Sequence, residues 1–151
     1  MAKFVYKMQS ILDIKYKLEN QAKAEYGMAV SILQGEKLKL DKIYDDIDKY
    51  KRELRDMNDG VLDVMKLKES SAALSYKKRE AQAQKVVVER AESRVERKKE
   101  KLNEMMVDRK THEKLREKAF GEFLKEIADQ ESKEIDELVS FQYNNQDTGE
   151  E

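Results

Sequence analysis

Apolar residues recur at every seventh position along two long stretches of the chain. In the first stretch they are Leu33, Leu40, Ile47 and Leu54. In the second they are Leu67, Leu74, Ala81, Val88, Val95 and Leu102. A further series, Ile43, Tyr50, Met57 and Val64, lies three residues after the members of the first series and their continuation. Seven-residue repeats with this offset are typical of the core positions of a coiled coil, so two long helices are predicted.

One strong turn signal separates the two series. The stretch Asn58-Asp59-Gly60 is turn chemistry, because glycine reaches positive φ without steric cost and Asn and Asp tolerate it. Reflection about the Gly60–Val61 bond pairs the apolar positions as Leu54 with Leu67, Ile47 with Leu74, Leu40 with Ala81 and Leu33 with Val88. We therefore predict an all-α fold, a long antiparallel two-helix coiled-coil hairpin in which helix 2 extends beyond helix 1.

The expected organisation is a single coiled-coil hairpin over residues 1–142. Helix 1 is expected over about residues 3–57, a turn over about 58–62 and helix 2 over about 63–142, with Asp63 or Ser70 as its N-cap. The N-terminal end of helix 1 then lies opposite about residue 118, so residues 119–142 of helix 2 continue without a partner helix. The tail, residues 143–151, is polar and expected to be disordered.

The composition agrees with long helices and argues against an enzyme. Charged residues make up 42% of the chain, hydrophobic residues 39%, and there is no proline or cysteine. Two paired helices bury only a seam and lack the layered core that walls off an active-site cleft. His112 is the only histidine, and with Asp108 and Glu113 it makes at most a weak metal site. No catalytic residue, cofactor or metal is predicted, and no glycine-rich phosphate loop is present.

Charge is distributed unevenly, although the net charge is only -1. Residues 61–118 hold 17 basic and 11 acidic side chains, whereas residues 119–151 hold 2 basic and 10 acidic ones. The basic middle invites the interpretation of a nucleic-acid-binding helical arm. Acidic residues interleave throughout it, however, which favours solvated helix faces, so no nucleic-acid partner is predicted. No run approaches the ~18–20 apolar residues that cross a bilayer, so direct membrane insertion is not expected either.

The predicted overhang carries an apolar stripe that no part of helix 1 is expected to cover. Its members are Ala119, Phe120, Phe123, Leu124, Ile127, Ile135, Leu138 and Phe141. The stripe either pairs with another copy, or is covered by a longer helix 1, or enters a groove or ring on another protein. We favour the last. The predicted partner-binding residues are Phe120, Phe123, Leu124, Ile127, Ile135 and Leu138.

Several short stretches carry a resemblance to a known family. They are the opening from Phe4 to Leu12, Asp56-Met57 followed by Gly60-Val61, the run from Arg97-Lys98-Lys99 to Leu102, Asp108-Arg109-Lys110, and the closing Lys133-Glu134-Ile135-Asp136-Glu137-Leu138. None is a catalytic signature. Together they span nearly the whole chain, which resembles the bacterial flagellar export protein FliJ, a component of the flagellar type III secretion apparatus.

The resemblance implies a stalk-like coiled coil, similar to the central stalk of rotary ATPases. Its expected partners are the hexameric export ATPase, bound at its centre, the transmembrane export gate protein, and export chaperones. The expected location is the cytoplasm, peripherally associated with the inner face of the cell membrane at the flagellar base. By position, the gate-binding candidates are Ile43, Tyr50, Leu74 and Tyr76. The competing interpretation is a non-flagellar coiled-coil adaptor or stalk.

Overall fold

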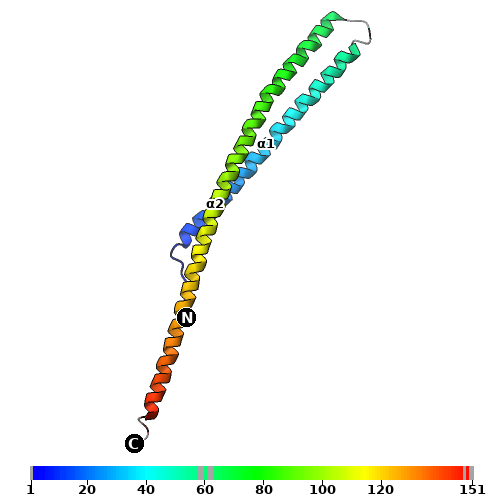
Figure 1. Cartoon of the computed structure of the whole chain (residues 1–151). Helices are drawn as coiled ribbons and strands as arrows, with labels where there is room; N and C mark the ends of the chain where they lie inside the picture. Colours follow the sequence, from blue (N-terminus) through cyan, green and yellow to red (C-terminus); the bar gives the residue numbers. More distant parts are fainter. Residues whose placement is uncertain (1, 58–59, 61–62, 148, 150–151) are drawn as a thin grey trace. The chain divides into compact units, whose positions relative to one another are not determined.

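The computed structural model describes residues 2–57, 60, 63–147 and 149. Two helices account for nearly all of them, α1 (Gln9–Met57) and α2 (Val64–Asp147). The described residues include no strand, and the helices pack against each other as a hairpin (Figure 1). The predicted all-α hairpin is therefore confirmed. Of the predicted turn, residues 58, 59, 61 and 62 lie outside the described part of the chain.

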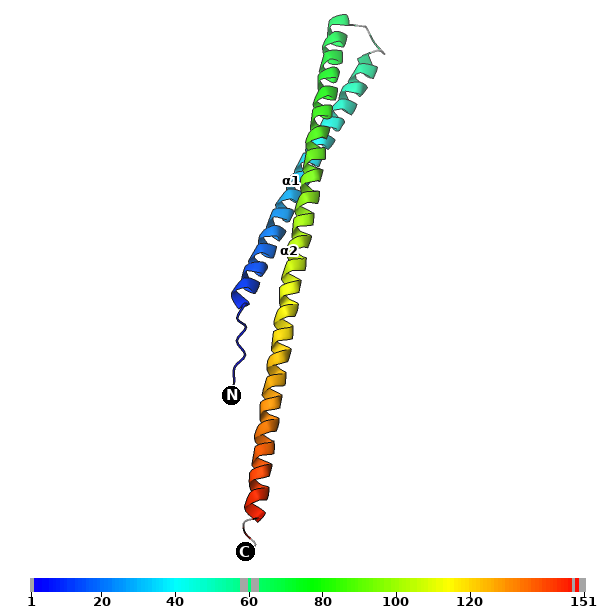
Figure 2. The ribbon, with the colours of Figure 1, turned by 60° about the vertical axis from the view of Figure 1, so that its left-hand side comes forward.

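Helix α1 begins at Gln9, later than the expected start near residue 3. The preceding residues Phe4-Val5-Tyr6 are aromatic and β-branched, and such side chains lose rotamer freedom in a helix. They form an irregular segment before the helix (Figure 2). Where the segment meets the helix, the Gln9 amide donates a hydrogen bond to the Tyr6 carbonyl at 3.2 Å. Residues 2–8 therefore follow a path that a helix would not take.

Helix α2 has a side-chain cap at its first turn. The Asp63 carboxylate accepts hydrogen bonds from the backbone amides of Met65 at 3.1 Å and Lys66 at 3.4 Å, which satisfies donors that have no partner within the helix. At its other end α2 reaches Asp147, further than the expected end at residue 142. No proline or glycine interrupts the chain between Gly121 and Gly149, so nothing stops the helix earlier.

The chain divides into two compact units, each containing part of both helices. The terminal unit consists of Met1–Glu19 and Met105–Glu151, and the loop unit of Asn20–Glu104. In the described residues of either unit, no helical segment is long and apolar enough to cross a membrane.

A thin apolar seam holds the loop unit together. Its main cluster consists of Ile43, Ile47 and Ala81, with Leu40 and Leu74 packed against it. This grouping brings together Ile47 with Leu74 and Leu40 with Ala81, as the sequence reflection predicts. The remaining buried apolar residues of the unit, Ala22, Ala29, Val88 and Ala91, are mostly alanines. Small side chains let two helix backbones approach closely, and they bury little apolar area per residue.

Polar residues interrupt the seam of the loop unit and pair across it. Lys77, Gln84 and Lys98 lie seven or fourteen residues apart on α2, in line with buried Ala91. The Gln84 amide donates to the Glu36 carboxylate at 2.6 Å and to the Glu36 carbonyl at 3.0 Å. Lys98 pairs with Glu25 at 3.0 Å. Because a shift of one helix along the other would separate such partners, they specify the register of the hairpin.

Candidate functional site

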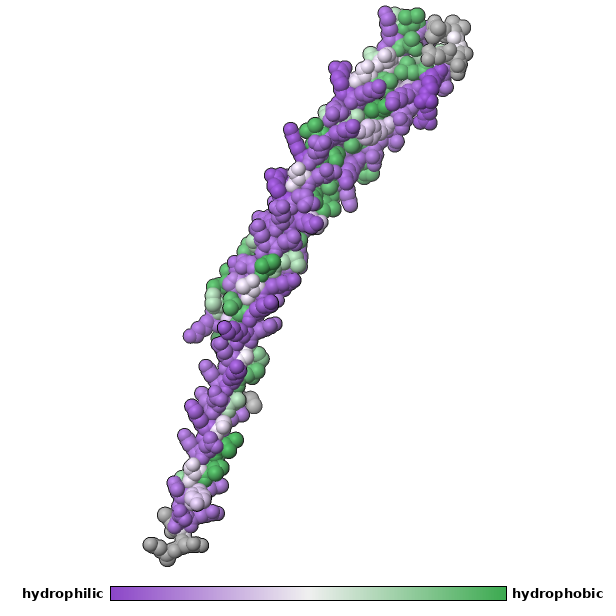
Figure 3. All heavy atoms as spheres, viewed as in Figure 1, coloured by the Kyte–Doolittle hydropathy of each residue, from purple (hydrophilic) through white to green (hydrophobic). Residues whose placement is uncertain are grey.

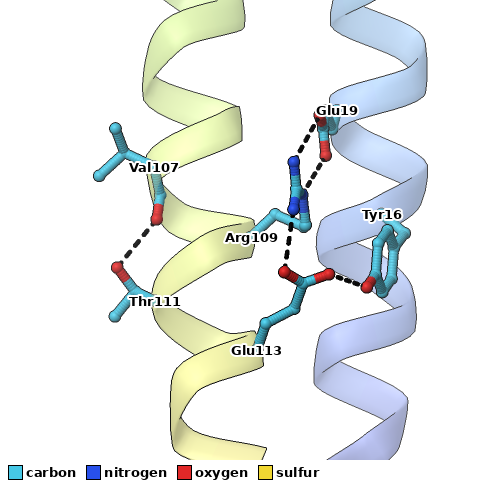
Figure 4. A network of polar contacts seen from close by, with 6 residues as sticks. All are labelled: Tyr16, Glu19, Val107, Arg109, Thr111 and Glu113. Atoms are coloured by element: carbon cyan, nitrogen blue, oxygen red, sulfur yellow. Dashed lines mark hydrogen bonds and ion pairs between the residues drawn. The ribbon is translucent and has the colours of Figure 1, made fainter.

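A polar network in the terminal unit fixes the start of α1 against α2 (Figure 4). The Arg109 guanidinium donates from Nε to Glu19 Oε2 at 2.6 Å and from Nη2 to Glu19 Oε1 at 3.2 Å. Its Nη1 donates to Glu113 Oε2 at 2.9 Å, and the Tyr16 hydroxyl donates to the other oxygen of Glu113. A bidentate arginine–carboxylate pair is both strong and geometrically specific. Two residues of each helix are thereby joined in one chain of hydrogen bonds.

The coiled-coil repeat explains why these charges lie inside. Glu19 is seven residues after buried Leu12, and Arg109 is seven residues after Leu102, so both occupy core positions of the repeat. Glu19 is only 3% exposed. A buried carboxylate needs a partner that compensates for lost hydration, and Arg109 supplies it.

The network also sets the protonation of its members. The hydrogen bond from Tyr16, together with Arg109, lowers the pKa of the Glu113 carboxyl. The same hydrogen bond raises the pKa of the Tyr16 hydroxyl. Glu19, and then Glu113, raise the pKa of Arg109. The carboxylate of Glu113 and the guanidinium therefore stay charged, and we assign the network to positioning, since its hydrogen bonds join the two helices.

The side chains of the weak metal-site candidate, His112, Asp108 and Glu113, take part in ion pairs. Lys15 binds Asp108 at 2.7 Å, and His112 Nε2 lies 3.6 Å from the same carboxylate. Glu113 is engaged by Arg109 and Tyr16. The structure gathers no group of three potential ligands among the residues it describes.

An aromatic cluster covers the first part of the apolar stripe. The ring of Phe4 lies 5.1 Å from that of Phe120, edge to face, and 5.3 Å from that of Phe123. The Arg116 guanidinium lies 6.0 Å from the centre of the Phe4 ring. The expectation that residues 119–142 have no cover within the chain is therefore wrong for Phe120 and Phe123. The irregular segment before α1 reaches them, although α1 itself begins later than expected.

The last part of α2 carries a stripe that the rest of the described chain leaves exposed. Every described residue from Ala128 to Asp147 is exposed. The large apolar side chains there, which we call the distal stripe, are Ile135, Leu138, Val139, Phe141 and Tyr143. Leu138 is 63% and Phe141 65% exposed. Figure 3 shows apolar residues between hydrophilic ones along this end of the helix.

The distal stripe is separate from the first part of the overhang. Leu124 is exposed and Ile127 is half-buried, and both follow directly on the aromatic cluster. Beyond them comes the polar stretch Asp129-Gln130-Glu131-Ser132-Lys133-Glu134. Of the six predicted partner-binding residues, Ile135 and Leu138 thus belong to the distal stripe, and the other four lie at or beside the aromatic cluster.

The four gate candidates have unequal exposure. Ile43 is buried in the core cluster of the loop unit, and Leu74 packs against that cluster. Tyr50 is half-buried, whereas Tyr76 is 62% exposed. Of the four, Ile43 alone is buried while the helices are paired; Leu74 and Tyr50 are half-buried, and Tyr76 is open to a partner.

The sequence pattern does not predict every contact in this unit. The apolar spacing from Phe4 to Leu12 predicts a helix, whereas the contact of Phe4 with α2 depends on an irregular path that no periodicity describes. The core positions of Glu19 and Arg109 had a signal, because Glu19 lies seven residues after Leu12 and Arg109 seven residues after Leu102. Reflection about the turn, however, places Glu19 opposite Leu102 and Arg109 opposite Leu12, so the sequence did not indicate that the two residues pair.

The family model described as "Flagellar FliJ protein" matches residues 4–148. The chain belongs to the FliJ family. Its hairpin, overhang and register network are thus features of a FliJ-family protein. A comparison with curated proteins finds no match for it.

A solved structure supports the same assignment. This FliJ-family chain is similar to the structure of a YscO homolog from Chlamydia trachomatis, with 25% sequence identity and a TM-score of 0.78. The alignment covers 98% of this chain and 100% of the other. FliJ-family proteins are non-catalytic structural and adaptor components of flagellar and related type III secretion, so this chain is a stalk protein of that machinery.

Proposed function

We propose that this FliJ-family chain binds the hexameric ATPase of the flagellar export apparatus and couples it to the export gate. It would work in the cytoplasm, at the inner face of the cell membrane at the flagellar base, and would also handle export chaperones. In this proposal the distal stripe of α2 is the ATPase-binding element.

The observation that carries the proposal is the exposure of the distal stripe. Large apolar side chains in water gain about 1.5–3 kcal/mol each when a partner buries them fully. Ile135, Leu138 and Phe141 follow one another at three-residue spacing on one side of the helix, which suits docking of the helix into an apolar groove or ring, and Val139 and Tyr143 widen the apolar surface. The overhang offers this helix without any need to separate α1 from α2.

The aromatic cluster divides the proposed surface into two parts. Ile135 and Leu138, with Leu124 and Ile127 nearer the cluster, are accessible or partly accessible as the chain stands. Phe120 and Phe123 already contact Phe4. They can join an interface fully only when residues 2–8 move away or become part of it.

The proposed gate contact lies in the loop unit and uses Tyr76 and Tyr50. Aromatic side chains with a polar hydroxyl are common in protein interfaces. Ile43 and Leu74 support this surface from the core, so their replacement would act through stability.

A binding assay with purified components tests the ATPase contact. The variant Ile135→Ala with Leu138→Ala should lower affinity for the export ATPase by roughly tenfold or more, because two anchors of the interface are shortened. The matched control is Met28→Ala with Leu38→Ala, which shortens two exposed apolar residues of α1 that are 66% and 69% exposed. Equal affinity of the two variants would remove the distal stripe from the interface.

A further inference from the structure

A hollow lined only by cationic side chains lies on the α2 surface of the loop unit. Its lining residues are Arg94, Arg97, Lys98 and Lys101, and its volume is about 350 Å³. Arg97 also lines a neighbouring, wider hollow together with Arg90 and Glu89. The two hollows share one ridge of α2, on which Arg90, Arg94, Arg97 and Lys101 are spaced by four, three and four residues. Residues with this spacing lie on one face of a helix.

The positive charge of this hollow is only partly compensated within the chain. Glu25 of α1 binds Lys98 at 3.0 Å and lies 3.8 Å from Lys101. These two lysines lower the pKa of the Glu25 carboxyl, so it stays ionised. No ion pair within the described residues involves Arg94 or Arg97, and both are exposed. Glu25 therefore compensates two of the four cations, and the two arginines have no ion-pair partner within the described residues.

Cations three and four residues apart repel each other and slightly destabilise the helix that carries them. An anionic partner removes this repulsion. The planar guanidinium of arginine matches a carboxylate or phosphate group through two parallel hydrogen bonds. The ridge extends over 11 residues, or roughly 16 Å of helix, so it can receive several anionic groups in a row.

The acidic residues beside the ridge decide between the classes of anionic partner. Glu89 lines the neighbouring hollow, and Glu100 follows Arg97 by three residues at the edge of the same face of α2. A nucleic acid carries closely and evenly spaced phosphates, and these would be repelled by the two glutamates along this side of the ridge. Discrete carboxylates on a second helix, spaced like the cations, can contact the ridge and avoid the glutamates.

We infer that the ridge Arg90–Arg94–Arg97–Lys101, with its hollow, is a docking site for an acidic helical segment of a partner protein. Arg94 and Arg97 each bind a carboxylate of that segment. Lys98 and Lys101 bind a carboxylate of the segment while they also remain paired with Glu25. The site lies in the loop unit and uses no residue of the distal stripe, so it is independent of the proposed ATPase contact.

The test uses the full-length chain and a synthetic helical peptide of about 15 residues with glutamates at positions i, i+4 and i+7. A second peptide carries glutamine at the same positions. Binding is measured by fluorescence anisotropy at low and at raised salt. The variant is Arg94→Gln with Arg97→Gln, and the control is Lys110→Gln with Lys114→Gln. The control removes the same charge from exposed residues of α2 in the terminal unit.

The glutamate peptide should bind the unchanged chain and lose affinity as salt rises, and the glutamine peptide should bind far more weakly. The arginine variant should lose roughly tenfold in affinity, and the lysine control less than about twofold. An equal loss in both variants would show attraction by overall charge and overturn the proposal.

Two other occupants are distinguished by further arms of the same experiment. A single-stranded oligonucleotide that binds more tightly than the glutamate peptide, and loses affinity with the arginine variant, would assign the ridge to nucleic acid. A dimer of the unchanged chain in sedimentation, lost in the arginine variant, would assign it to a second copy. Either result would overturn the inference of a separate acidic partner. Circular dichroism confirms that both variants remain folded.

Discussion

Replacement of Phe4 by alanine should detach the segment before α1 from α2 without unfolding the hairpin. The Phe4 ring makes two aromatic contacts, with centroid distances of 5.1 Å to Phe120 and 5.3 Å to Phe123. Each such pair contributes about 0.5–1.5 kcal/mol, and burial of part of the ring adds roughly 1 kcal/mol. A loss of about 2 kcal/mol changes the detachment equilibrium by roughly 30-fold.

The detachment can be followed at one backbone amide. The Gln9 amide donates to the Tyr6 carbonyl within the segment, and we expect this bond to open once contact with α2 no longer orders the segment. Hydrogen exchange at Gln9 should therefore accelerate by roughly 30-fold in the variant, because exchange follows the population of the open state. The midpoint of urea unfolding, followed by circular dichroism, should change little, since the seam of the loop unit is untouched.

The neighbouring residue provides the control. Val5 is 75% exposed, so Val5→Ala should leave the exchange of Gln9 nearly unchanged. Unaltered exchange in Phe4→Ala, or equal acceleration in both variants, would refute the conclusion that the aromatic cluster holds this segment.

Three further predictions concern the hairpin. Ile47→Ala should lower the free energy of unfolding by about 2–4 kcal/mol, because Ile47 is buried in the core cluster. The control Leu38→Ala, at a 69% exposed position of the same helix, should change that free energy by less than about 0.5 kcal/mol. Similar losses of the two variants in urea titrations would contradict the observed seam. Leu40→Cys with Ala81→Cys should form a disulfide within one chain, seen as a faster-migrating monomer without reductant; crosslinked dimers alone would show that the facing pair belongs to two chains. Ion pairing lowers the carboxyl pKa of Glu25, chiefly through Lys98, and of Asp108, chiefly through Lys15. A carboxyl whose pKa is lower in the folded state stabilises that state at pH values above its unfolded-state pKa, and this contribution is lost as the pH falls through its folded-state pKa. The free energy of unfolding should therefore decline below about pH 4.5. A flat profile down to about pH 3 would argue against these pairs.

The sequence predicted the hairpin and its register in the loop unit because both depend on a strict repeat. Seven-residue spacing places Ile47 and Leu74 on facing seams, and reflection about the turn brings them together. The same repeat assigns Glu19 and Arg109 to core positions, although their polarity concealed them from a search for apolar residues.

The ends of the helices were harder to predict because local preferences compete there. The apolar spacing from Phe4 to Leu12 predicts a helix that starts near residue 3, whereas α1 begins at Gln9 and the Phe4 ring contacts Phe120 and Phe123. At the other end, the polar residues 143–147 suggested a tail, but no helix-breaking residue separates them from the preceding turns. Helix 2 is predicted to be longer than helix 1, so its last part has no partner helix. The sequence therefore predicted the exposure of Ile135, Leu138 and Phe141 in the distal stripe.

The central proposal is that the distal stripe engages the export ATPase. Its most direct test measures the ATP hydrolysis rate of the purified export ATPase against increasing amounts of this protein. The unchanged chain and the control Met28→Ala with Leu38→Ala should stimulate the rate equally. The variant Ile135→Ala with Leu138→Ala and Phe141→Ala should give little or no stimulation, with an unchanged circular-dichroism melt, because all three side chains are exposed in the free chain. Full stimulation by this folded variant would contradict the proposal that the distal stripe is the ATPase-binding element.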